Sequence, residues 1–244
     1  MTKLLEVKHL KKEFDNIIAV NDVSFQMDVG ESVGIVGESG CGKSTLVYLI
    51  AGLLKPDEGQ ISIQKPSPRG GKRKKTDHRI NMVFQDPVDS FDSRMNVFQS
   101  LYEALYYTDR CSRKEAEKRI QEILQKVHLP KEYMERKVSS LSGGECQRVA
   151  IARVILTEPD LFIFDEATSA LDVSVQIQIM RLLADLKKEK NFSYLFVSHD
   201  WGVIAQLCTS VFVMYKGRIV EEGKVLDIMK KPKHPYTQLI INCA

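Results

Sequence analysis

The chain has 244 residues, of which 43% are hydrophobic and 27% are charged, and its net charge at neutral pH is +3. This balance is ordinary for a globular protein with one substantial core, argues against disorder, and gives no sign of a nucleic-acid partner. The 5 cysteines are scattered without a C-x-x-C pair, so we expect neither a disulfide framework nor a zinc site and favour a reducing cytoplasm.

The N-terminal residues 1–14 alternate apolar and charged side chains and lack the apolar core of a signal peptide. No window approaches the roughly 20 consecutive apolar residues that cross a bilayer as a helix, so another chain must supply any membrane span. Residues 4–8 and 19–27 alternate with period two. This pattern predicts half-buried strands of an antiparallel sheet near the N-terminus.

A glycine-rich loop follows the next predicted strand, residues 32–36, and precedes a predicted helix over 44–54. The loop, GESGCGKS at 37–44, has the G-x-x-x-x-G-K-[ST] spacing that turns consecutive backbone N–H groups toward one anion. We expect the backbone from Gly40 to Thr45 to wrap a β-phosphate and the Lys43 ammonium to reach the β- and γ-phosphates. The Ser44 hydroxyl is the expected Mg²⁺ ligand. The motif therefore predicts a nucleoside triphosphate as the ligand.

Two segments after the loop have no apolar strand pattern. Residues 65–79 are basic and contain Pro and Gly; we favour a solvated connection over a nucleic-acid or anionic-lipid patch because flanking aromatics are missing. Residues 97–127 have helical periodicity and abundant helix formers. They predict a helical subdomain inserted at about 88–157 into a single domain that spans 1–244.

Candidate catalytic side chains follow two later strands. Residues 161–164 predict a buried strand that delivers Asp165 and Glu166, and residues 193–197 predict a second strand that ends near His199. Parallel strands bring their carboxyl ends to one edge of a sheet, where α/β proteins place ligands. Asp165 would then orient Mg²⁺, Glu166 would polarise the attacking water, and His199 would contact the γ-phosphate. Without the upstream loop, a helix N-cap would explain the two carboxylates about as well as a catalytic role does.

One further motif, LSGGE at 141–145, precedes a predicted helix over 147–156. The whole chain resembles ATP-binding cassette (ABC) ATPases. The resemblance rests on the order of the motifs along the chain, which is the glycine-rich loop, Gln85, LSGGE, the Asp165–Glu166 pair, SALD at 169–172 and His199. The resemblance implies a P-loop NTPase cassette of the α/β class: a RecA-like core, an N-terminal antiparallel β subdomain and an inserted helical subdomain. It also implies ATP hydrolysis with Mg²⁺.

The resemblance also assigns residues. It implies that Ser142, Gly143 and Gly144 bind the γ-phosphate held by a second cassette, that Gln85 senses Mg²⁺ and the transmembrane subunit, and that Asp172 lies at the dimer seam. It further implies that Phe14 stacks on adenine, although core packing is nearly as good an explanation. The expected nucleotide-binding set is Phe14, Gly37, Glu38, Ser39, Gly40, Cys41, Gly42, Lys43, Ser44, Thr45, Ser142, Gly143, Gly144 and Asp172. Ser44, Gln85 and Asp165 are the expected metal ligands.

A finer resemblance comes from QDPVDSFD at 85–92 and KPKHPYTQL at 231–239. Both are similar to the branch of importers for oligopeptides, dipeptides, nickel and metal chelates. Peptide-specific members usually continue well past the His-Pro-Tyr-Thr segment, so the short tail favours nickel or metal-metallophore import, with a truncated peptide-type cassette as the alternative.

The resemblance implies partners and a location. The expected partners are a second cassette, favoured as a related chain over an identical one, two integral membrane permease subunits and, indirectly, an extracytoplasmic solute-binding protein. The chain would then lie at the cytoplasmic face of the cell membrane. Two alternatives remain open: the ATPase of a phosphonate-cleaving C–P lyase complex, and a soluble ABC protein that acts on nucleic acid or ribosomes.

Overall fold

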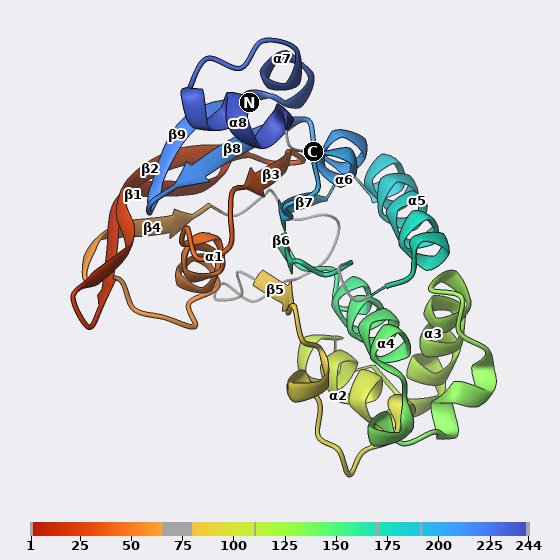
Figure 1. Ribbon diagram of the computed structural model, residues 1–244. Helices are drawn as coiled ribbons and strands as arrows, with labels where there is room; N and C mark the ends of the chain where they lie inside the picture. The colour runs from red at the N-terminus through yellow and green to blue at the C-terminus, as the bar shows by residue number, and fades with distance from the viewer. Residues whose placement is uncertain (1, 65–79, 110, 169–170, 191, 243–244) are drawn as a thin grey trace. The chain divides into compact units, whose positions relative to one another are not determined.

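The computed structural model describes residues 2–64, 80–109, 111–168, 171–190 and 192–242. The chain divides into two compact units, and Figure 1 labels the helices and strands. Unit 1 comprises Met1–Ile80, Asp160–Asp165 and Lys187–Ala244, and unit 2 comprises Asn81–Pro159 and Glu166–Leu186. The basic stretch at 65–79 lies outside the described residues.

Unit 1 contains an antiparallel sheet of three strands in the order β2-β1-β4. Its strands are β1 (Lys3–Phe14), β2 (Ile17–Asp28) and β4 (Glu58–Ile63). The period-two pattern gave the two N-terminal strands correctly, but both are longer than predicted because they continue through β-bulges where the register shifts.

The second sheet of unit 1 has β6, β7, β3, β8 and β9 side by side in that order. These strands are β3 (Ser32–Val36), β6 (Leu161–Asp165), β7 (Ser193–Val197), β8 (Ser210–Tyr215) and β9 (Arg218–Lys224). The first four are parallel and β9 is antiparallel. Every residue of β3, β6 and β7 is buried, as expected for parallel strands covered on both faces. Helices α1 (Lys43–Ile50), α6 (Trp201–Leu207), α7 (Val225–Lys230) and α8 (Pro235–Asn242) complete the unit.

Helix α1 ends earlier than the predicted residue 54 for a local reason. Gly52 adopts φ 74°, its N–H donates to the Leu49 carbonyl at 3.1 Å, and the Leu53 N–H donates to the Tyr48 carbonyl at 2.9 Å. This is the Schellman pattern, in which a left-handed glycine closes the helix.

Unit 2 is mainly helical. Its helices are α2 (Val97–Asp109), α3 (Arg113–Lys126), α4 (Gly143–Leu156) and most of α5 (Val173–Lys190), with short 3-10 turns η1 (Val88–Ser90), η2 (Lys131–Glu135) and η3 (Val138–Ser140). Strand β5 (Ile80–Val83) leads into it. The predicted helical stretch 97–127 is two helices, because the Ser112 side chain caps a new helix by accepting the Glu115 N–H at 3.3 Å. No helix in the described part of the chain is long and apolar enough to cross a membrane.

Candidate functional site

The glycine-rich loop lies where the sequence predicted it, between β3 and α1 in unit 1. Gly42 has φ 104°, and a Cβ there would lie 2.0 Å from the Ala19 carbonyl oxygen; a Cβ on Gly37 would lie 2.3 Å from the Met214 carbonyl oxygen. Both positions therefore require glycine, because the loop packs directly against neighbouring backbone. A Cβ on Gly40 would have no neighbouring atom within 4 Å. Glu38, Ser39 and Gly40 form the exposed part of the loop.

The Lys43 ammonium lies inside the curve of this loop. Nζ donates to the Gly37 carbonyl at 2.8 Å and to the Glu38 carbonyl at 2.9 Å, and only 5% of the residue is exposed. Thr45 follows in the first turn of α1, where backbone N–H groups and the helix dipole favour an anion. A cation and a helix N-terminus thus meet at one loop, which is an arrangement suited to phosphate.

Cys41 is part of the loop, but its thiol is not a reactive group. The residue is buried, and burial raises the pKa of its thiol. A thiol with a raised pKa stays protonated at neutral pH and is a poor nucleophile. The structure therefore agrees with a packing role for this side chain.

Ser44 and Asp165 form the candidate metal site. The Ser44 Oγ donates to the Asp165 Oδ1 at 3.2 Å, and Asp165, the last residue of β6, is fully buried. A hydroxyl and a carboxylate oxygen are hard donors of the kind Mg²⁺ prefers, so these two side chains fit the ion. Tyr48 was not predicted as a site residue, but burial and the neighbouring Asp165 carboxylate raise its pKa. Its position one helical turn after Ser44 in α1 is the sequence feature that could have indicated it.

The end of β7 brings His199 to the same edge of the sheet. Asp165 pairs with Val197, and the Ser198 N–H donates to the Ile35 carbonyl of β3 at 3.2 Å. The predicted convergence of the β3, β6 and β7 carboxyl ends is confirmed, and exposed His199 follows directly.

Glu166 follows Asp165 in a strained conformation. Its φ of 47° is uncommon for a non-glycine residue, and such strain is concentrated at functional sites. Within unit 2, the Gln147 amide donates to the Ala167 carbonyl at 2.6 Å and holds the segment that follows Glu166. Gln147 is 1% exposed and was not predicted as a site residue, because no local sequence pattern indicates its contact with the Ala167 carbonyl.

The LSGGE segment is the N-terminus of α4. The Ser142 Oγ accepts the Glu145 N–H at 3.3 Å and the Glu145 carboxylate accepts the Ser142 N–H at 2.8 Å, which is a capping box. This makes α4 begin at Gly143, four residues before the predicted start at 147. The Tyr133 hydroxyl donates to the Glu145 carboxylate and is the main cause that lowers the pKa of this carboxyl. Gly143 and Gly144 thus form the first turn of α4, and backbone N–H groups at a helix N-terminus are suited to binding an anion.

The other predicted residues have simpler surroundings. Asp172 caps α5 by accepting the Ser174 hydroxyl at 2.6 Å and the Val175 N–H at 3.0 Å, and Ser174 is the main cause that lowers its pKa. Ser169 and Ala170 lie outside the described residues. Gln85 is exposed in the bend after β5. Phe14 ends β1 with 42% of its surface exposed, so it is not a core residue, and the core-packing alternative is wrong.

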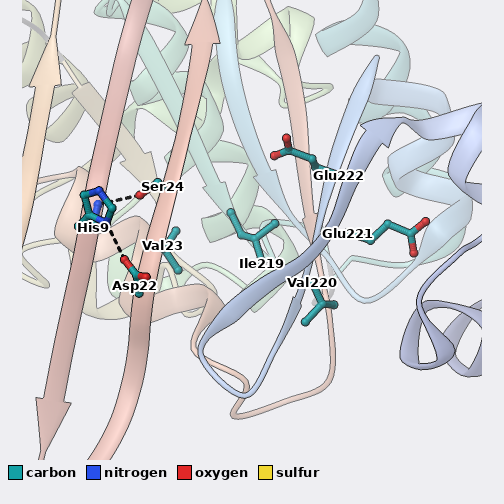
Figure 2. Close-up of a pocket in the computed structure, with 8 residues that line it drawn as sticks. All are labelled: His9, Asp22, Val23, Ser24, Ile219, Val220, Glu221 and Glu222. Atoms are coloured by element: carbon teal, nitrogen blue, oxygen red, sulfur yellow. Dashed lines mark hydrogen bonds and ion pairs between the residues drawn. The ribbon is translucent and has the colours of Figure 1, made fainter.

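A hollow in unit 1 lies between the β1–β2 pair and β9. It has a volume of about 450 Å³ and is lined by His9, Asp22, Val23, Ser24, Ile219, Val220, Glu221 and Glu222. Figure 2 shows His9 fixed at one side, with Nδ1 at 2.8 Å from the Asp22 carboxylate and the backbone N–H bonded to the Ser24 hydroxyl. Across the described ranges, His, Cys, Asp and Glu side chains form no group of three or more that could hold a metal ion.

Comparison with known proteins gives consistent matches. The family model described as ABC transporter matches residues 20–169. The chain is 39% identical over 260 residues to the oligopeptide transport ATP-binding protein OppF of Haemophilus influenzae, covering 99% of this chain and 78% of that protein. It is 40% identical to the probable D,D-dipeptide transport ATP-binding protein DdpF of Escherichia coli, covering 96% and 72%.

Among solved structures, the chain is similar to the dimeric, post-hydrolysis structure of the ATP-binding cassette MJ0796 bound to ADP and Pi. The TM-score is 0.79 at 29% identity, and the match covers 91% of this chain and 99% of that one.

Proposed function

Because the chain belongs to the ABC transporter family, we propose that it energises a bacterial importer of short peptides. As a member of this family it binds ATP, and its ATPase activity is coupled to transport. The observation that carries the proposal for the site is the Ser44–Asp165 contact of 3.2 Å beside the loop that encloses Lys43. A cation, a hydroxyl and a carboxylate are the groups that P-loop enzymes use to bind a magnesium-bound triphosphate, which supports the proposal.

Each predicted site residue has a separate task in this proposal. Lys43 and the first turn of α1 bind the β- and γ-phosphates, Phe14 stacks on adenine, and His199 holds the attacking water in line with the γ-phosphate. Ser44 and Asp165 of unit 1 would hold Mg²⁺, and the family resemblance adds Gln85 of unit 2 as a third ligand. When bound, the ion neutralises charge that develops on the phosphate oxygens. Glu166 accepts the proton of the water that attacks the γ-phosphate.

We propose that the site is completed by a second cassette, either a related chain or an identical one. Ser142, Gly143 and Gly144 bind the γ-phosphate held on that partner, and Asp172 lies at the seam. The dimeric assembly of the similar cassette with ADP and Pi supports this arrangement. In the same proposal, residues of about 88–157 form the helical subdomain that, with Gln85, contacts two permease subunits. The chain then sits peripherally at the cytoplasmic face, and the permeases receive solute from a binding protein.

Short peptides are the cargo class that the relatives support, because both named relatives are peptide transport proteins by their description. The shortness of the tail favoured nickel or a metal-metallophore in the sequence, but neither relative supports that interpretation. In a strain deleted for this gene, we expect uptake of a labelled tripeptide to fall to background while nickel uptake stays normal. Loss of nickel uptake alone would contradict the peptide proposal, and copurification with C–P lyase subunits or ribosomes instead of permeases would contradict import altogether.

Replacement of the loop lysine gives a direct test of nucleotide binding. Lys43→Ala should weaken ATP binding at least about tenfold, because hydrogen bonds to charged groups contribute more than neutral ones. Isothermal titration calorimetry with ATP measures the effect. The matched control is Lys55→Ala, an exposed lysine beyond the end of α1 in the same unit, which should bind ATP normally. Equal affinity of the Lys43 variant and the wild type would exclude the phosphate role.

A further inference from the structure

The KPKHPYTQL segment has no task in the mechanism above, yet it is built into the core of unit 1. Its last five residues belong to α8, which Figure 1 shows beside β8 and β9. Tyr236 is 7% exposed and Thr237 is fully buried. Burying polar side chains costs free energy unless they form hydrogen bonds, so a segment with no role beyond ending the fold would not need to bury both of them.

The start of α8 is fixed to β9. The backbone N–H groups of Lys233 and His234 donate to the Glu221 carboxylate at 2.8 and 3.0 Å, and the Tyr236 N–H donates to the His234 Nδ1 at 3.2 Å. The Tyr236 ring packs against that of Tyr215, the last residue of β8, with ring centroids 4.2 Å apart and an interplanar angle of 30°. These contacts leave the Tyr236 ring little freedom to change direction.

The hydroxyl of this fixed ring reaches the phosphate loop. The backbone N–H of Glu38, the second residue of the loop, donates to the Tyr236 Oη at 2.8 Å. Burial is the main cause that raises the pKa of Tyr236, so its hydroxyl stays protonated and neutral at physiological pH. The contact joins residues that are 198 positions apart in the chain.

Other contacts also hold the same loop. The Cys41 carbonyl accepts the Gly217 N–H at 3.0 Å, from the turn between β8 and β9. The Glu38 carbonyl accepts the Lys43 ammonium at 2.9 Å and the Cys41 N–H at 3.3 Å. A phosphate that attracts Lys43 would draw the ammonium away from Glu38. The Tyr236 hydroxyl contacts the other side of the Glu38 residue and does not depend on Lys43.

We propose that Tyr236 is a positioning residue of the nucleotide site, which holds the first turn of the phosphate loop in its binding conformation. A loop that is already ordered loses less conformational freedom when the ligand binds, so part of the affinity for nucleotide depends on this hydroxyl. The inference rests on the proposed role of this loop in binding ATP. It gives the His-Pro-Tyr-Thr motif a function that concerns the nucleotide rather than the transported solute.

Tyr236→Phe keeps the ring and removes the hydroxyl. We expect the Kd for both ATP and ADP to rise about 3- to 10-fold, the effect of losing one neutral hydrogen bond. In the assembled transporter, KM for ATP should rise by the same factor while kcat stays within about twofold, because the chemical step keeps all its groups. A purely structural role would instead lower the melting temperature without nucleotide and leave the Kd unchanged.

The control is Tyr215→Phe, which removes a hydroxyl from the ring packed against Tyr236 and leaves the contact with Glu38 in place; it should bind both nucleotides as the wild type does. Amide hydrogen exchange of the wild type gives a test that needs no variant: the Glu38 amide should exchange more slowly than those of Ser39 and Gly40. Unchanged Kd values in Tyr236→Phe, or an unprotected Glu38 amide, would overturn the inference. A wild type that fails to bind ATP would instead contradict the proposed function itself.

Discussion

Glu166→Gln is expected to lower kcat for ATP hydrolysis by about 10²- to 10⁴-fold while ATP remains bound, because the amide cannot accept a proton from the attacking water. The replacement conserves volume, and Lys43, Ser44 and Asp165 are unchanged. Affinity for ATP should therefore stay close to that of the wild type. Bound ATP that is not hydrolysed should also prolong the associated state of two cassettes. Steady-state ATPase assays and ATP titrations of the assembled transporter measure both effects.

The matched control is Glu117→Gln, which makes the same change of charge on the exposed face of α3 in unit 2. It should hydrolyse ATP at the wild-type rate. If Glu166→Gln retained more than about a tenth of wild-type turnover, Glu166 would not be the general base, and His199 would have to be tested in that role. If the variant lost ATP binding as well, the side chain would contribute to the site in another way.

Ser142→Arg is expected to abolish nucleotide-driven association of cassettes and to lower ATPase activity by at least about 10²-fold, the effect of losing hydrogen-bond donors aimed at developing charge. The arginine places a long side chain over Gly143 and Gly144, where the partner's γ-phosphate would bind. The P-loop of the same chain is untouched, so ATP affinity of the isolated subunit should not change. Analytical ultracentrifugation with and without ATP measures the association.

The chain offers a close control for this variant, because Ser112 caps α3 as Ser142 caps α4. Both side chains accept the N–H of the residue three positions later at 3.3 Å. Ser112→Arg therefore removes an equivalent cap, worth about 0.5–2 kcal/mol of stability, without touching the LSGGE segment. It should associate and hydrolyse ATP normally. Equal loss in both variants would mean that the effect of Ser142→Arg comes from instability and not from a blocked phosphate site.

The sequence predicted the parts of the fold that depend on local pattern. The buried strands β3, β6 and β7 were visible as short apolar runs, since parallel strands are covered on both faces and need no alternation. The loop glycines were visible because close backbone approach at Gly37 and Gly42 tolerates no Cβ. The start of α4 was missed although Ser142 and Glu145 fit the S-x-x-E capping pattern, because the LSGGE segment was read only as a binding motif.

Contacts between residues far apart in the sequence could not be predicted from local sequence patterns. Nothing local to Gln147 indicates that its amide holds the backbone after Glu166, and nothing local to Tyr236 indicates that its hydroxyl reaches Glu38. Both contacts arise from tertiary packing, which brings together residues without a fixed spacing. The strained φ of Glu166 is likewise a consequence of its surroundings and not of its residue type.

A structure of the assembled transporter that carries Glu166→Gln, determined with ATP and Mg²⁺, would show whether two cassettes share each nucleotide. We expect the Gly143 N–H to lie within hydrogen-bond distance of a γ-phosphate bound by the glycine-rich loop of a neighbouring cassette. A γ-phosphate enclosed by one chain alone, with Gly143 of every cassette far from any phosphate, would contradict it.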